Sequence, residues 1–354
     1  MRLAPLLGKR RKLQSRDKRR LRSGVRALAS VLVTVRTAGR RGHGERLRSR
    51  APLPTLGVPV LSEPRLGVAI VTMGNRPREL NALLKSVAEQ DVAPVRLVVV
   101  GNGTPLPEFP AHPGEVTVIE LDENLGCPGG RNVALRRLRE FGDVDVAIEL
   151  DDDGLLVDPG VFRTVRDLFA GDPRLGIAGF RIADETGGTQ RRHVPRLRAG
   201  DPMRGGPVTS FLGGGHAFSM RMLAETGEWP AEFFFTHEET DLAWRALDAG
   251  WTIRYEPELL LQHPKTSPAR HAVYYRLTAR NRVWLARRRL PLPLIPVYLG
   301  VWTLLTLART RSPAGLRAWA AGFLEGLRTP CGERRPMRWR TVWLMTRLGR
   351  PPVL

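Results

Sequence analysis

Short apolar runs alternate with helix-period segments through the patterned part of the chain, which begins near residue 65. Runs rich in β-branched residues at 66–73, 95–100, 116–121 and 144–150 predict buried strands. Between them, apolar residues recur at helical spacing at 80–87 and 133–141. Strands that alternate with helices in this way indicate βαβ units, so we expect an α/β fold with a mostly parallel sheet flanked by helices.

The pattern is less regular after residue 151. A glycine triplet at 213–215 lies within an apolar, strand-like stretch. Residues 237–250 predict a helix that opens with acidic side chains and ends at Gly250, and 251–255 and 259–262 predict two short strands. We therefore expect a main domain at 65–265, between a basic tail with a Pro-rich linker at 1–64 and a basic helical region at 266–354.

Charge is distributed unevenly along the chain, whose formal net charge is +21. Residues 1–50 and 266–354 each carry 17 basic and 2 acidic residues, and the middle is net negative. A nucleic-acid-binding module usually carries its basic patch on the folded module itself, so nucleic acid is not an expected partner. Basic ends suit an anionic membrane surface or a polyphosphate, although an Arg-rich composition alone would also explain them.

Residues 290–308 form an uncharged stretch between arginines. A membrane-spanning helix needs about 20 apolar residues, but Pro291, Pro293 and Pro296 interrupt the first third. We expect an interfacial helix, with a buried core helix as the alternative. Two cysteines without a ligand motif and the lack of a recognisable signal peptide predict a cytoplasmic protein. The basic ends and the stretch at 290–308 predict that it is peripheral at the inner face of the cell membrane.

Polar side chains gather where the predicted strands end. Asp151, Asp152 and Asp153 follow the strand at 144–150 directly, and Asn102 follows an earlier one. Ligands of α/β sheets bind beyond the carboxyl ends of the strands. Carboxylates suit Mg²⁺ or Mn²⁺, which would bridge them to a diphosphate. A solvated acidic turn or a helix cap would also explain three aspartates.

A second acidic group opens the predicted helix at 237–250. Acids at a helix start stabilise its dipole, or one of them is a general base that deprotonates an acceptor hydroxyl. Asp241 also has the spacing to pair with Arg245. The glycine-rich turn at 123–132 suits an anion, but it has neither P-loop nor dinucleotide-binding spacing.

In this order the motifs resemble those of family 2 glycosyltransferases, which have the GT-A fold, with a Rossmann-like sheet. The family pattern V-T-x-N-R-P is V-T-M-G-N-R-P here, and D-N-G-S is G-N-G-T. The N-x-G-x-x-G-x-R-N segment matches with one residue of slack, L-D-x-D is L-D-D-D, and an E-E-x-D-L-x-x-R helix and a late histidine follow. Each motif is weak alone, and the ordered set over 66–265 carries the resemblance.

The resemblance implies metal-dependent, inverting transfer of a sugar from a nucleotide-diphosphate sugar to an acceptor hydroxyl, in the synthesis of a polysaccharide, cell-envelope glycan or glycoconjugate. It implies nucleotide-sugar contacts at Thr72, Asn75, Arg76, Asn102, Asn124, Gly129, Arg131, Asn132, Asp151 and Asp152. It places Mn²⁺ or Mg²⁺ on Asp153, with Asp151 and His263 as further ligands, although a lone histidine is also commonly structural. Glu239 would be the base, with Asp241 as runner-up. The glycan or lipid-linked acceptor would meet Gly214, Gly215, Glu238 and Arg280.

Arg280 belongs to a segment at 274–282 that is similar to the Y-Y-x-x-R-N segment of rhamnosyl- and galactofuranosyltransferase-like members. An ordinary basic helix explains it equally well. Two other functions remain open. A sugar-phosphate nucleotidyltransferase shares the sheet topology but needs a G-x-G-T-R loop, which 73–76 does not supply. A non-enzymatic protein could bind polyanions through the Arg-rich ends.

Overall fold

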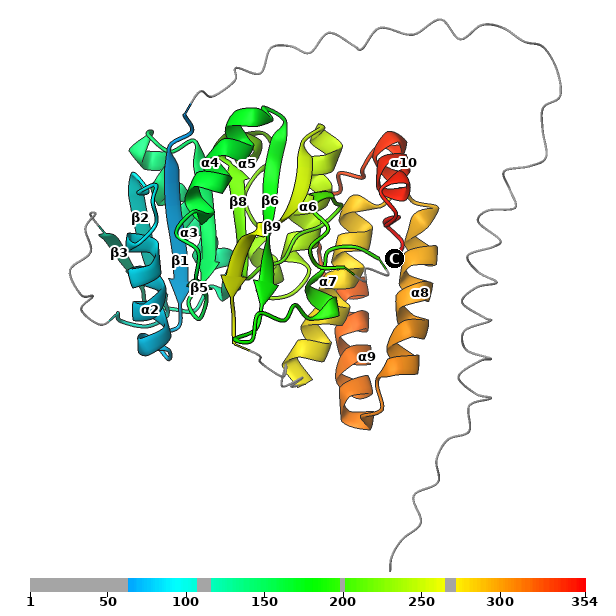
Figure 1. Cartoon of the computed structure of the whole chain (residues 1–354). Coiled ribbons are helices and arrows are strands. Elements are labelled where there is room, and N and C mark those ends of the chain that lie inside the picture. The colour runs from blue at the N-terminus through cyan, green and yellow to red at the C-terminus, as the bar shows by residue number, and fades with distance from the viewer. Residues whose placement is uncertain (1–62, 107–115, 198–200, 265–271) are drawn as a thin grey trace, which may run out of the picture. The chain divides into compact units, whose positions relative to one another are not determined.

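The computed structural model describes residues 63–106, 116–197, 201–264 and 272–354 (Figure 1). The basic tail and nearly all of the linker predicted at 1–64 lie outside the described residues. The described residues belong to one compact unit, Gly57–Leu354.

One mixed sheet organises the described chain (Figure 1). In spatial order its strands are β3 (Val116–Leu121), β2 (Arg96–Asn102), β1 (Leu66–Thr72), β4 (Val146–Asp151), β8 (Gly215–Ser219), β6 (Leu175–Ala183), β9 (Thr252–Gln262) and β5 (Leu155–Leu156), and β7 (Gly206–Pro207) pairs with β9. Strands β3, β2, β1 and β4 are parallel, as are β6 and β9, whereas β8 is antiparallel to both of its neighbours. The predicted α/β fold with a mostly parallel sheet is confirmed, with antiparallel strands added.

Helices cover both faces of the sheet because each contributes an apolar stripe to one of two cores. On one face lie α2 (Pro77–Ala88) and α4 (Val161–Gly171), whose buried side chains share a core with β1 and β4. On the other lie α3 (Gly126–Phe141), α5 (Met220–Thr226) and α6 (Glu238–Ala249). Two short 3₁₀ turns, η1 (Arg191–His193) and η2 (Ala231–Phe233), lie in the connections.

Four helices follow the sheet: α7 (Ala272–Arg289), α8 (Leu294–Arg309), α9 (Pro313–Arg328) and α10 (Trp339–Arg347). Helices α7 and α9 approach each other closely, since a Cβ added at Gly322 of α9 would lie 2.0 Å from the Arg276 carbonyl oxygen of α7. Trp284 and Tyr298 belong to the same buried core as Phe233. The C-terminal helices therefore share a core with the sheet domain.

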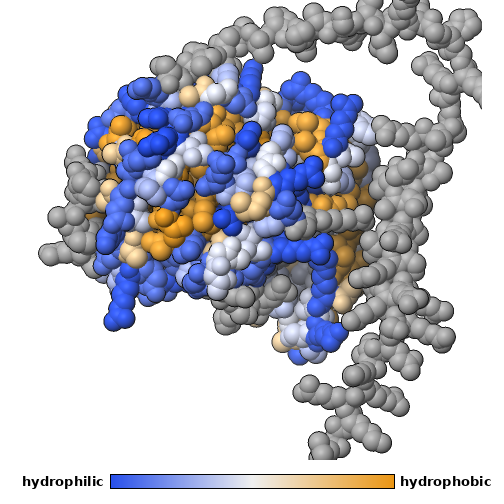
Figure 2. Space-filling model, viewed as in Figure 1, coloured by the Kyte–Doolittle hydropathy of each residue, from blue (hydrophilic) through white to orange (hydrophobic). Residues whose placement is uncertain are grey.

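Helix α8 is the most apolar helix, yet Tyr298 is its one buried side chain. Leu304 is 62% exposed and Leu307 is 55% exposed. Hydrophobic residues also reach the surface among charged ones on the face drawn in Figure 2. Among the described residues, every helix is too short or too polar to cross a membrane.

The structure differs from the expected elements in the second half of the sheet. The two strands expected at 251–255 and 259–262 are one strand, β9, whose pairing with β6 shifts register after Phe180. Pro257 lies at this irregularity and cannot donate a ladder hydrogen bond. The sequence analysis also missed α4 and β6.

Candidate active site

Three predicted metal ligands converge at the carboxyl ends of β4 and β9. Ligand atoms of Asp151, Asp153 and His263 all lie within 4.8 Å of one another. His263 Nε2 is 2.9 Å from Asp153 Oδ1 and 3.9 Å from Asp151 Oδ2. Two carboxylates and an imidazole form a donor set that suits Mn²⁺ or Mg²⁺. The third aspartate, Asp152, instead accepts a hydrogen bond of 2.6 Å from the Thr72 hydroxyl.

Positive side chains neutralise this acidic group. Arg76 contacts both Asp152 and Asp153. Burial acts to raise the pKa of Asp153, but the hydrogen bond to His263 and the charge of Arg76 lower it overall. The same hydrogen bond raises the pKa of His263 to about 9. Burial raises the pKa of Asp152. The cluster therefore attracts positive charge, as a cation site must.

Arg131, in the second turn of α3, joins this cluster to the middle of the sheet. It is only 4% exposed. Its Nη2 donates to Asp151 Oδ1 at 2.8 Å and to the Gly213 carbonyl at 2.6 Å. Its Nη1 is buried without a hydrogen-bond partner. A buried, unused guanidinium donor is costly, so this atom is suited to bind a ligand oxygen.

A buried polar network supports Arg131 from behind. Glu149 Oε2 lies 3.9 Å from Arg131 Nε and 2.7 Å from His216 Nε2. Trp229 Nε1 donates to the same carboxylate at 3.1 Å. Asn132 in turn exchanges two hydrogen bonds of 2.9 Å with the Trp229 backbone. Glu149, His216 and Trp229 were not predictable as site residues from the sequence, because they occupy strand and loop positions without a recognisable motif.

Glu239 and Arg131 both approach Gly213. A Cβ added at Gly213 would be 2.6 Å from Glu239 Oε1 and 3.6 Å from Arg131 Nη1. Only glycine at this position allows both side chains to approach the same point of the backbone. The base candidate and the unused donor of Arg131 therefore border the same small region.

The acids at the start of α6 lie in different environments. Burial raises the pKa of Glu239 and, more strongly, that of Glu238. Glu239 is half-buried and reaches a cavity, whereas Glu238 is buried. Asp241 is 0% exposed and accepts hydrogen bonds from Arg245 and Arg289. The structure does not bring Asp241 to the cavity.

The segment before α6 adopts an uncommon backbone conformation. Phe234, Thr236 and His237 all have positive φ, at 64°, 72° and 68°. Such conformations cost about 1–3 kcal/mol each in residues other than glycine. The Asn281 amide of α7 donates to the carbonyls of residues 233, 235 and 236 at 2.8–2.9 Å. Asn281 therefore holds the turn that aims Glu239.

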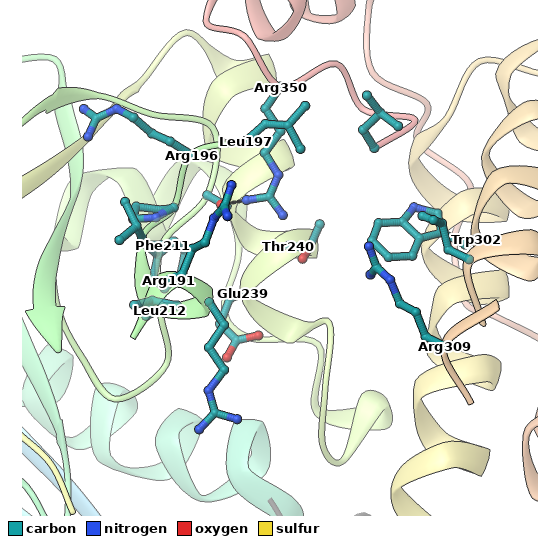
Figure 3. A pocket seen from close by; sticks show the side chains of 16 residues that line it. Arg191, Arg196, Leu197, Phe211, Leu212, Glu239, Thr240, Trp302, Arg309 and Arg350 are labelled. Atoms are coloured by element: carbon teal, nitrogen blue, oxygen red, sulfur yellow. Dashed lines mark hydrogen bonds between the residues drawn. The ribbon is translucent and has the colours of Figure 1, made fainter. Parts of the chain in front are cut away.

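A cavity of about 520 Å³ opens beside Glu239 (Figure 3). Its walls come from η1 and the segment after it, from 210–212, from α6, from α8 and from the C-terminal end. Arginines are prominent in its lining: Arg191, Arg192, Arg196, Arg309 and Arg350. The sequence analysis missed this set because its members are up to 159 positions apart along the chain.

A family model described as glycosyl transferase family 2 matches residues 68–227. The chain contains a family 2 glycosyltransferase domain. The match confirms the predicted enzyme class and favours transfer over nucleotidyl transfer or polyanion binding alone. Glu239 and His263 lie beyond the matched residues. The likeness to rhamnosyl- and galactofuranosyltransferase-like members stays a prediction.

Solved structures with a similar fold are also glycosyltransferases. TarS 1–349 of S. aureus has a TM-score of 0.51 and 14% identity, covering 75% of this chain and 81% of that chain. The same protein in complex with UDP-GlcNAc has a TM-score of 0.51 and 13% identity, over 79% and 83%. GalNAc-T7 with UDP, GalNAc and Mn²⁺ has a TM-score of 0.52 and 13% identity, over 74% and 54%. At these identities the likeness shows the GT-A fold. A comparison with curated protein sequences finds no match.

The predicted nucleotide contacts of the glycosyltransferase domain lie at neighbouring strand ends. Asn75 is exposed after β1. Asn102 is buried at the end of β2, where it donates to Asn124 Oδ1 and to the Gly126 carbonyl and accepts from the Leu125 amide. Asn102 and Asn132 thus make hydrogen bonds within the protein. Gly129 packs against the Leu125 side chain in the same turn.

The predicted acceptor contacts of the glycosyltransferase are separated. A Cβ at Gly214 would lie 3.4 Å from Asp151 Oδ2, next to the predicted metal ligands, whereas one at Gly215 would meet the core side chain of Leu261 at 2.9 Å. Arg280 donates to the Glu232 and Phe233 carbonyls and lies over the Trp284 ring. The structure therefore brings Gly214 to the site but engages Arg280 in holding the turn before α6.

Proposed function

We propose that this glycosyltransferase transfers a sugar from a nucleotide-diphosphate donor to an acceptor hydroxyl, with inversion and with Mn²⁺ or Mg²⁺ as cofactor. The observation that carries the proposal is that Glu239 lies beside Gly213, while the group of Asp151, Asp153 and His263 lies beside the adjacent Gly214. The names of two similar structures add support, since one contains UDP-GlcNAc and another UDP with Mn²⁺.

In a single displacement, different residues of this chain would bind the cation, bind the donor and remove the acceptor proton. Asp153, with Asp151 and His263, would hold the cation, which when bound stabilises the negative charge of the leaving nucleoside diphosphate. The unused Nη1 of Arg131 would donate to an oxygen of the donor. Such preorganised donors stabilise charge that develops in the transition state.

Glu239 acts as the general base of this mechanism. The acceptor oxygen forms a bond to the anomeric carbon while the bond from that carbon to the diphosphate oxygen breaks, and Glu239 takes the acceptor proton. Burial raises the pKa of Glu239, while Arg131 and His216 act to lower it. A carboxylate with a raised pKa is a stronger base than a free one, which favours proton removal near neutral pH.

The site of action in this proposal is the cytoplasmic face of a membrane, where a glycan or glycoconjugate of the cell envelope is assembled. Support comes from the exposed apolar side chains of α8, such as Leu304 and Leu307, and from Arg309 and Arg311 at its end. A helix that presents apolar and basic side chains together binds anionic membrane surfaces.

The proposal is tested with purified protein and a panel of UDP-, GDP- and dTDP-sugars. We expect one donor with Mn²⁺ to raise the melting temperature of the wild type and of Glu239→Gln, but not of Asp153→Asn. Nucleotide release on sugar transfer should fall about 100-fold to 10,000-fold in Glu239→Gln because the base is lost. Glu79→Gln, an exposed acid on α2, is the control. Full transfer activity in Glu239→Gln would show that Glu239 is not the base.

A further inference from the structure

The cavity beside Glu239 is strongly cationic. Five arginines line it, and Glu239 is the one acidic side chain in its lining among the described residues. Figure 3 shows Arg191 and Arg350 on one side of Glu239 and Thr240, and Arg309 with Trp302 on the other. A cavity with this charge favours anionic ligands, because field lines concentrate in a recess lined by one sign of charge.

Four of these arginines have no carboxylate partner within the described part of the chain, namely Arg191, Arg196, Arg309 and Arg350. Arg350 donates to the Ser210 hydroxyl at 2.6 Å, and burial lowers its pKa. Arg191 and Arg309 make no ion pair there. Arg196 differs, since it donates to the Gly205 and Gly206 carbonyls and so shapes the wall. Arg350 is largely buried, and a desolvated cation without a counter-charge is costly, so an anion beside it would supply stabilisation that the protein does not. Arg191 and Arg309 are exposed and add positive charge to the lining.

Besides Arg309 and Arg350, α8 and the C-terminal end contribute apolar side chains to the cavity wall. These are Trp302, Leu305 and Leu354. The guanidinium of the buried Arg282 lies 3.7 Å from the centroid of the Trp302 ring and orders this wall from behind. The outward face of the same helix exposes Leu304 and Leu307. The cavity thus joins a cationic region to apolar surface.

We propose that this cavity is the acceptor site and that the acceptor carries a phosphate or diphosphate group, bound by Arg191, Arg309 and Arg350. Guanidinium groups match phosphate oxygens with paired hydrogen bonds. The acceptor hydroxyl then points to Glu239, which borders the same cavity. This inference rests on the proposed function, because it assigns the anionic ligand to the acceptor side of the reaction.

Two sources of phosphate fit this chemistry, a lipid carrier and a soluble sugar phosphate. Calorimetry on the full chain without metal or nucleotide compares three probes: inorganic pyrophosphate, dodecyl phosphate and dodecyl maltoside, the last two below micelle formation. We expect both phosphate probes to bind and dodecyl maltoside to bind more weakly. Dodecyl phosphate binding at least about 10-fold tighter than pyrophosphate would assign a lipid carrier, because a dodecyl chain buries apolar area. Equal affinities would assign a soluble phosphate, and both outcomes support a phosphate site.

The variants Arg309→Gln and Arg350→Gln locate the site. Each substitution should lower the affinity for both phosphate probes about 10-fold to 100-fold, as expected for the loss of a charged hydrogen bond. Arg309 is exposed, so its substitution leaves the fold intact if Arg350→Gln proves unstable. Arg317→Gln on α9, an exposed arginine away from the cavity, is the control and should bind as the wild type does.

Two results separate this inference from the proposed function. If the wild type binds a nucleotide sugar with Mn²⁺ but phosphate binding is the same in Arg309→Gln, Arg350→Gln and the wild type, the acceptor assignment is wrong. Dodecyl maltoside binding as tightly as dodecyl phosphate would also overturn it, since the cavity would then recognise only apolar chains. If no nucleotide sugar binds the wild type, the proposed function itself fails.

Discussion

Replacing Asp241 by asparagine tests whether this residue stabilises the protein or takes part in catalysis. Its carboxylate is 0% exposed, and Arg245 Nε and Arg289 Nε donate to it at 2.9 Å and 2.7 Å. Arg288 lies 3.9 Å away. Asparagine keeps the shape of the side chain but removes the negative charge, so the arginines remain buried around a neutral group.

The expected loss of stability follows from these contacts. Breaking a buried ion pair by removing one partner costs about 3–5 kcal/mol, because the other charge stays desolvated. The free energy of unfolding of a native protein is about 5–15 kcal/mol, so this loss is a large share of it. The arginines also lower the pKa of Asp241 although burial opposes them. Because the folded pKa is lowered, the stabilisation is present above the unfolded pKa and is lost as the pH falls through the folded one.

Urea unfolding followed by circular dichroism measures the effect. With a slope of about 3 kcal/mol per molar urea, the midpoint of Asp241→Asn should fall by about 1–1.7 M. Asp167→Asn, an exposed aspartate that pairs with Arg166 on α4, is the control and should change stability by less than about 1 kcal/mol. An unchanged midpoint together with a 100-fold loss of transfer would show that Asp241 is catalytic and that our reasoning is wrong.

Three further predictions follow from the packing and the site. Gly322→Ala should destabilise the protein, because the added Cβ would lie 2.0 Å from the α7 backbone. The control is Gly300→Ala on α8, where the added Cβ meets open space, so this variant should be as stable as the wild type or more stable. Equal melting temperatures of the two variants would contradict this prediction. Asn281→Ala should lower the free energy of unfolding by about 2–6 kcal/mol, because two buried hydrogen-bond donors are lost. Thr278→Ala is the control and should leave the free energy of unfolding unchanged, since the Thr278 hydroxyl has no hydrogen-bond partner. Urea unfolding of both variants measures the difference. Burial raises the pKa of Glu239, so the rate of transfer at saturating Mn²⁺ should fall with decreasing pH at a pH above the ordinary pKa of a carboxyl group. The residual activity of Glu239→Gln should lack this acid limb of the pH profile.

The parallel half of the sheet was predictable from local sequence. Strands β1, β2 and β4 are continuous apolar runs because both of their faces are buried, and such runs carry a local signal. The sequence of the second half of the sheet carries a weaker local signal for strands. Strand β9 continues past Pro257 because β6 pairs with it on both sides of the irregularity, and that pairing is visible only in three dimensions.

The placement of Asp151, Asp153 and His263 was also predictable, because parallel strands bring their carboxyl ends to one edge of the sheet. The acids of α6 were not separable from sequence. Glu239 and Asp241 lie two residues apart, and they differ because Arg289, 48 positions away, pairs with Asp241 alone.

The sequence by itself determined the enzyme class, the α/β fold and the strand-end position of the proposed metal ligands, because these depend on local periodicity and on motifs in a set order. The tertiary structure alone decided which acid of α6 faces the cavity and which arginines surround it. Arg191, Arg309 and Arg350 come from three distant segments. The charge of a site is the sum over whatever side chains the fold brings together, and no local pattern records that sum.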